Sequence, residues 1–205
     1  MTTKWGFLML LVLLTYACSG QQADQKVGGP CEGCEALYEY GDKNLSHTDT
    51  FPRFDESANK ILVKGRVLAL DGKTPVEDVI IYAYHTDEHG IYPKKGDPDD
   101  WSARHGYLRG WVKTNKNGEY QIYTFRPASY PNTTIPQHIH VTIKEEGKTP
   151  YFIDDILFDD DPNLSDYERS KQRKRGGSGI VTPVVQNGIL IIERDIILGM
   201  NIQGY

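Results

Sequence analysis

Short runs of alternating apolar and polar residues dominate the chain from about residue 60 onward. The runs are rich in β-branched and aromatic residues: KILVKGRVLAL, DVIIYAYHT, GYLRGWVKT, GEYQIYTF, QHIHVTIKE and GILIIERDIIL. Turn-forming stretches such as DGKTP, DEHG and NKNG separate several of them, and no run keeps a long helical period. We therefore predict an all-β sandwich with long loops over 93–106 and 154–188, and a short helical turn near DPNLSDYERSKQ.

The pattern divides the chain into three segments. Residues 1–18 have the character of an export signal, and residues 19–57 are a polar, glycine-rich tether followed by an irregular stretch. Residues 58–205 form the predicted β-sandwich domain. A length of 205 residues suits one such domain preceded by a leader.

The N-terminal segment predicts export from a bacterial cytoplasm. A lysine precedes an apolar run over 5–16, and small residues surround Cys18. The run is short for a membrane span, and Cys18 after Ala17 resembles the lipid-modified cysteine of bacterial lipoproteins. We therefore expect a lipid anchor at Cys18 that holds the protein on a membrane, in the periplasm or on the cell surface. Simple secretion is the alternative, because Thr15 stands where the lipoprotein signal usually has leucine.

Two further cysteines, Cys31 and Cys34, lie in the exported part of the chain in GGPCEGCEALYEY. An oxidising compartment favours a disulfide between them, which would clip the N-terminal edge of the domain. A zinc knuckle would need two more soft ligands nearby, and a redox C-x-x-C motif would be expected to open a helix after a strand. We therefore predict a structural disulfide.

Charge gives no sign of a nucleic-acid partner. The net charge is −5, the acidic residues are spread along the chain, and the one basic cluster, SKQRKRGG, is short and borders glycines. The cluster is interpreted as a solvated loop.

A pair of histidines in IPQHIHVTI is the first candidate for chemistry. In a β-strand, residues i and i+2 lie on one face, so the imidazoles of His138 and His140 converge. Such a pair is often only a solvated face or a hydrogen-bonded core histidine. A zinc site for hydrolysis is an alternative, with a third ligand drawn from His85, His89 or His105.

Two family resemblances bear on the role of this histidine pair. VKGRVLALDGKTPVEDVIIYAYHTD and the later KTNKNGEYQIYTFRPASY are similar to transthyretin-like and carboxypeptidase-regulatory-like sandwich modules, which often lack catalysis. The chain from Lys64 to its C-terminus also resembles the intradiol ring-cleavage dioxygenases, which share this sandwich. The matching words are HTDEHGIY, LRGWVKTNKNGEYQIYTFRPASYP, PQHIHV and ILIIERDIIL, in the order of that family.

The second resemblance implies a non-haem Fe(III) site held by Tyr92, Tyr130, His138 and His140. A hard trivalent ion favours anionic oxygen ligands, and two phenolates cancel much of its charge. The resemblance implies that Tyr130 is also catalytic, since the substrate displaces it and it takes up a proton. It further implies a small aromatic diol and dioxygen as substrates, a muconate-type diacid as product, and assembly into homo-oligomers, as in many relatives.

The chain departs from the family at the position of a substrate-side arginine, where Ile135 stands. Arg109 and Arg126 are the candidate substrate-binding replacements, although a structural role suits both. Tyr84 stands where relatives often have tryptophan. A non-catalytic transthyretin-like binding domain is therefore kept as the alternative function.

Overall fold

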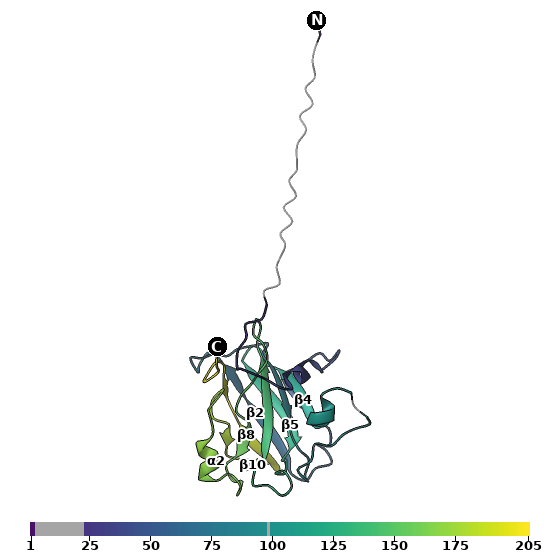
Figure 1. Ribbon diagram of the computed structural model, residues 1–205, viewed down its shortest axis with the longest axis vertical. Helices are drawn as coiled ribbons and strands as arrows, with labels where there is room; N and C mark the ends of the chain where they lie inside the picture. The colour runs from purple at the N-terminus through teal and green to yellow at the C-terminus, as the bar shows by residue number, and fades with distance from the viewer. Residues whose placement is uncertain (3–22, 98) are drawn as a thin grey trace.

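Two β-sheets make up the computed structural model, which describes residues 1–2, 23–97 and 99–205 (Figure 1). In this part of the chain, one six-stranded sheet contains β1 (Thr48–Thr50), β5 (Glu119–Phe125), β2 (Lys60–Leu68), β11 (Ile189–Glu193), β10 (Val184–Gln186) and β12 (Ile196–Ile197). The second contains β4 (Arg109–Lys113), β3 (Ile80–Tyr84), β6 (His138–Lys144), β8 (Ile156–Phe158), β9 (Ile180–Val181) and β7 (Tyr151–Phe152). The predicted all-β sandwich is confirmed.

The main core lies between these sheets and follows the period-two pattern of the strands. Ile61 and Val63 of β2 are buried against Ile81 of β3 and against Ile139 and Val141 of β6. Because Ile139 and Val141 point into this core, His138 and His140 must point to the outer face of the second sheet. The burial of apolar side chains therefore decides on which face the histidines stand.

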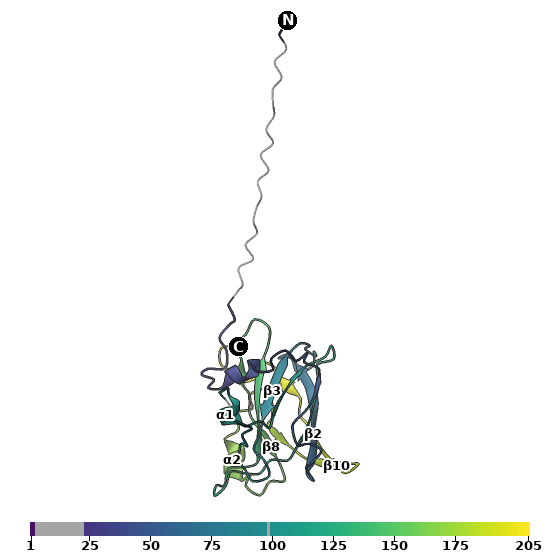
Figure 2. The ribbon, with the colours of Figure 1, turned by 90° about the vertical axis from the view of Figure 1, so that its right-hand side faces the viewer.

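The N-terminal segment covers that outer face. The 3₁₀ helix η1 (Cys34–Tyr38) buries Ala36 and Leu37 in a second apolar cluster with Tyr82, Tyr84 and Trp111 of the sheet. Figure 2 shows η1, α1 (Ser102–His105) and α2 (Asp166–Ser170) on one side of the sandwich, and β2 and β10 on the other. The side that carries the histidines is thus enclosed by loops and short helices.

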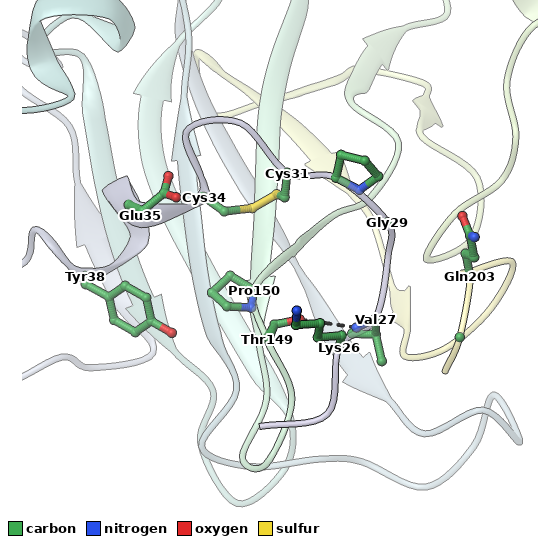
Figure 3. A pocket seen from close by; sticks show the side chains of 12 residues that line it. Lys26, Val27, Gly29, Cys31, Cys34, Glu35, Tyr38, Thr149, Pro150 and Gln203 are labelled. Carbon is green, nitrogen blue, oxygen red and sulfur yellow. Dashed lines mark hydrogen bonds between the residues drawn. A yellow bond between two sulfur atoms is a disulfide. The ribbon is translucent and has the colours of Figure 1, made fainter. Parts of the chain in front are cut away.

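The folded unit begins earlier than residue 58, where the sequence pattern places it. Gln25 forms a β-bridge with Lys148, the Val27 side chain is buried, and β1 pairs in parallel with β5. Cys31 and Cys34 are joined by a disulfide beside Pro150 (Figure 3). Described residues of the expected tether, and of the irregular stretch after it, are therefore part of the folded domain.

The segment 154–188 is not the plain loop that the pattern predicts, because it contains β8, α2, β9 and β10. The helical turn expected near DPNLSDYERSKQ is confirmed as α2, whose N-terminus is capped by the Ser165 hydroxyl accepting from the backbone N–H of Glu168. Cys18 and its predicted lipid anchor lie outside the described residues. No helix in the described part of the chain is long and apolar enough to cross a membrane.

Candidate metal centre

The two histidines of β6 direct their Nε2 atoms toward the same point. Their Nε2 atoms lie 3.2 Å apart. The Nδ1 of His138 lies 2.7 Å from the carbonyl oxygen of Pro136, and the Nδ1 of His140 lies 3.1 Å from Oδ1 of Asp155. Both partners are acceptors, so each Nδ1 carries the proton and donates it, and each Nε2 keeps a free lone pair. Both rings are therefore held in the tautomer that a metal ligand at Nε2 requires.

Two tyrosine hydroxyls complete the cluster. The Tyr92 hydroxyl lies 2.9 Å from Nε2 of His140 and 2.5 Å from the hydroxyl of Tyr130. The Tyr130 hydroxyl lies 3.1 Å from Nε2 of His138 and 3.5 Å from Nε2 of His140. Ligand atoms that each lie about 2 Å from a common ion are roughly 3 Å from one another. The geometry of these atoms therefore fits a single metal ion among them.

Two loops bring the tyrosines together. Tyr92 follows a turn after β3, and Tyr130 lies in the connection between β5 and β6. Gly90, at φ +76°, allows close approach: a Cβ there would lie 2.0 Å from the carbonyl oxygen of Ser129. The backbone N–H of Ala128 also donates to the carbonyl of Asp87 at 3.0 Å. The loops are thus in direct backbone contact.

Burial sets the protonation states of these side chains. Loss of water around the phenols raises the pKa of Tyr92 and of Tyr130, and a hydrogen bond with Tyr130 raises the pKa of Tyr92 further. Burial and the neighbouring His140 lower the pKa of His138. A cation reverses the preference of the phenols, because it stabilises phenolate. The donor set is then two phenolate oxygens and two imidazole nitrogens, which suits a hard trivalent ion such as Fe(III) better than Zn²⁺.

Asp155 is a neighbour of this cluster that the sequence analysis missed. His138, His140 and Asp155 can bring one ligand atom each within 4.8 Å of one another, which would permit a different metal set. However, the Asp155 carboxylate binds Nδ1 of His140, on the opposite side of the ring from the Nε2 atom that faces the tyrosines. We therefore assign Asp155 the role of orienting His140. An aspartate immediately before the short strand β8 was the only sequence signal for it.

Tyr84 is a second neighbour, noted in the sequence only as a substitution for tryptophan. It stands opposite His140 in the β3–β6 register, and its ring stacks on His140 at a centroid distance of 4.5 Å. The Tyr84 ring also stacks on His105, at a centroid distance of 4.0 Å. The His140 imidazole is therefore held at its Nδ1 by a carboxylate and on its face by an aromatic ring.

A hollow of about 240 Å³ opens beside the ligands. It reaches Tyr130, His138 and His140, and its other walls include Ile135 and Leu157, with Glu168 and Gln172 from α2 and the residues after it. A larger hollow of about 620 Å³ lies at the Cys31–Cys34 disulfide (Figure 3) and shares no lining residue with the first. The hollow beside the histidines and Tyr130 is therefore the candidate substrate pocket.

Neither arginine suggested by the sequence lines this pocket. Arg109 is paired with Glu39 and with Asp100, and Arg126 binds both carboxylate oxygens of Asp160 at 2.7 and 2.9 Å. Both guanidinium groups are already occupied by structural ion pairs. The structure thus gives no support to a substrate-binding role for Arg109 or Arg126.

Two of the three additional histidines of the zinc alternative, His85 and His105, have other partners. Nε2 of His85 lies 2.6 Å from Oγ1 of Thr124, and Nδ1 of His105 lies 2.9 Å from the hydroxyl of Tyr82. Burial lowers the pKa of His85 and of His105 to about 4, so both are neutral structural groups. Among the described residues, His138, His140 and Asp155 are the one group of His, Cys, Asp or Glu side chains close enough to hold a metal.

A β-sandwich of two mixed sheets, with two tyrosines and two histidines converging beside the outer face of one sheet, is the arrangement expected of a metal-dependent dioxygenase. The family described as Dioxygenase matches residues 38–175, more than half of the chain, and the chain belongs to this family, the intradiol dioxygenases. Over 98 residues it is 31% identical to catechol 1,2-dioxygenase 1 of Acinetobacter lwoffii, an alignment that covers 47% of this chain and 30% of that relative.

Solved structures show the same fold. The dioxygenase domain of a dioxygenase carbohydrate-binding protein fusion from Streptomyces sp. SirexAA-E superposes with a TM-score of 0.57 at 18% identity, over 86% of this chain and 97% of that one. The 3-chlorocatechol 1,2-dioxygenase of Rhodococcus opacus 1CP gives a TM-score of 0.56 at 20% identity, over 75% of this chain and 65% of that one. At these identities the likeness shows the shared fold.

Proposed function

We propose that this protein is a non-haem Fe(III) intradiol dioxygenase, which inserts dioxygen between the two hydroxyl-bearing carbons of a catechol-type aromatic and yields a muconate-type diacid. The observation that carries the proposal is the convergence of the hydroxyls of Tyr92 and Tyr130 with Nε2 of His138 and of His140, at spacings of 2.5 to 3.5 Å. Membership of the intradiol dioxygenase family supports the same reaction class.

These four side chains would hold the ion. A bound ferric ion supplies an electron-accepting centre that makes an aromatic diol reactive toward dioxygen. Within the chain, Tyr130 lines the pocket and Tyr92 does not. The Tyr130 phenolate oxygen is therefore the group placed to accept a proton from a substrate hydroxyl, and Tyr92, which hydrogen-bonds to both Tyr130 and His140, remains in place.

The walls of the pocket orient the aromatic ring. Ile135, Pro136 and Leu157 present apolar surface beside the histidines and exclude water from one side of the reacting atoms. The imidazoles are held in orientation by the hydrogen bonds from Nδ1 of His138 to the carbonyl of Pro136 and from Nδ1 of His140 to Asp155. These residues bind, orient and transfer a proton; the redox chemistry belongs to the metal and dioxygen.

The test is a visible absorption spectrum with iron analysis, before and after anaerobic addition of catechol, followed by dioxygen uptake. A tyrosinate-to-iron band that shifts with catechol supports the proposal. A protein that stays colourless after ferric loading refutes it. Tyr130→Phe should move the band and reduce turnover, whereas Tyr38→Phe, at a half-exposed tyrosine that does not line the metal pocket, should change neither.

We also propose that the protein is exported and anchored to a bacterial membrane through Cys18. The apolar run before Cys18 and the disulfide between Cys31 and Cys34 support an oxidising compartment outside the cytoplasm. Fractionation of cells tests this proposal: a protein with a lipid anchor sediments with membranes and is released by detergent, and a purely soluble protein contradicts it.

A further inference from the structure

A second hollow, of about 190 Å³, adjoins the substrate pocket. The two share Asp155, Leu157 and Gln172 as lining residues, so a ligand at the metal centre has this second hollow directly beside it. Its remaining wall includes Lys171, Arg173 and Arg175, which belong to the basic cluster SKQRKRGG. The cluster that looks like a solvated loop in the sequence therefore stands next to the candidate active site.

The carboxylates of the two hollows all have partners. Asp154 accepts from Nε of Arg175 at 3.0 Å, Glu168 pairs with Nζ of Lys171 at 2.9 Å, and Asp155 is bound to Nδ1 of His140. These pairs also occupy Lys171 and Arg175.

Arg173 remains as the cation of this wall that forms no ion pair in the described part of the chain. Its backbone is nevertheless fixed, because the Asn201 side chain donates to the carbonyl oxygens of Arg173 and Lys174 at 3.0 and 3.2 Å. A guanidinium on a fixed backbone, in a hollow that adjoins the substrate pocket, is a ready partner for a carboxylate, which it can bind through two parallel hydrogen bonds.

We propose that Arg173 binds a carboxylate substituent of the aromatic diol whose ring lies at the metal centre. This inference rests on the proposed function and adds the substrate class: diols that carry an acidic side group, such as dihydroxybenzoates or dihydroxycinnamates. Ile135, which lines the pocket beside the metal ligands, offers no cation there. Arg173, in the segment after α2, would supply a positive charge for the substrate carboxylate in its place.

The experiment uses the iron-loaded protein and two kinds of diol. Anaerobic spectral titration and dioxygen uptake compare catechol with 3,4-dihydroxybenzoate and 3,4-dihydroxycinnamate. The wild type should prefer a carboxylated diol over catechol, and Arg173→Gln should weaken binding of the carboxylated diol about 3- to 10-fold more than that of catechol, as expected for an exposed ion pair. Arg173→Lys should restore part of the preference, and added salt should reduce it.

Lys116→Gln is the matched control, since it removes one positive charge from an exposed turn outside both hollows. Its diol preference should equal that of the wild type. Equal effects of Arg173→Gln on both kinds of diol, or no preference in the wild type, overturn the inference while leaving the proposed function intact. A wild-type protein whose spectrum responds to no diol overturns both.

Discussion

Replacement of Asp155 tests whether the carboxylate behind His140 tunes the metal centre. In the structure, Oδ1 of Asp155 accepts a hydrogen bond of 3.1 Å from Nδ1 of His140. Asp155→Asn keeps an acceptor oxygen at this position but removes the charge, and Asp155→Ala removes both. The two variants therefore separate the contribution of the charge from that of the hydrogen bond.

The expected loss of iron affinity in these variants follows from two independent considerations. Loss of a partner that orients a metal-bound histidine typically lowers metal affinity by about 10- to 100-fold. A hydrogen bond to a charged group contributes about 1.5–3 kcal/mol, which corresponds to a similar range of fold-changes in affinity. The Asp155 side chain is 37% exposed, so water screens its charge. We therefore expect the lower end of the range for Asp155→Asn, less than about tenfold, and about tenfold or more for Asp155→Ala.

The assay is competition for iron against a chelator of known affinity, with the tyrosinate-to-iron band as the readout. A structural role alone would lower thermal stability without moving the band. The role assigned here predicts that the band shifts in both variants, because a less basic His140 alters the electron density on the metal. Unchanged iron affinity and an unchanged band in Asp155→Ala would refute the assignment, and would also exclude Asp155 as a direct ligand, because the loss of a ligand lowers iron affinity.

Two further predictions concern the surroundings of the centre. Tyr84→Ala, which removes a ring stacked on both His140 and His105, should cost about 3–5 kcal/mol of unfolding free energy in chemical denaturation, whereas Tyr84→Phe keeps the stack and should lose little. His85, fully buried and with its pKa lowered to about 4, stays neutral in the folded protein while the unfolded chain takes up a proton near pH 6.5. Stability should therefore fall as the pH drops from about 6.5 to 4, by at most about 3 kcal/mol from this group. His85→Gln should reduce that slope in iron-free protein; an identical slope in the variant would contradict the prediction.

The sheets and the histidine pair could be predicted because they depend on local periodicity. Alternation along 60–68, 119–125 and 138–144 specifies strands, and burial of Ile139 and Val141 forces His138 and His140 onto the same outer face. The strands β8, β9 and β10 were not predicted, because a strand of two or three residues is too short to show an alternating pattern in the sequence. Their pairing with neighbouring strands of the sheets, not their own sequence, makes them extended.

The contacts of the two tyrosines, and those of the neighbours of His140, could not be predicted from local sequence patterns. Tyr92 and Tyr130 were proposed from family resemblance, and their approach depends on a backbone contact between two loops at Gly90, which no local pattern reveals. The pairing of Tyr84 and Asp155 with His140 depends on register across β3, β6 and β8. Register is fixed by how the whole core packs.

The sequence by itself thus determined the class of fold, the face on which the histidines stand and, through resemblance, the set of donor residues. Only the tertiary structure decided that these donor atoms meet within 3.5 Å. It also decided that Arg109 and Arg126 form ion pairs with Glu39 and Asp160, which lie far from them in the sequence, and that Arg173 lies beside the pocket. The physical reason is the range of the forces involved: side-chain alternation acts between neighbours in the chain, whereas ion pairs, loop contacts and cavities join residues that only the packed core brings together.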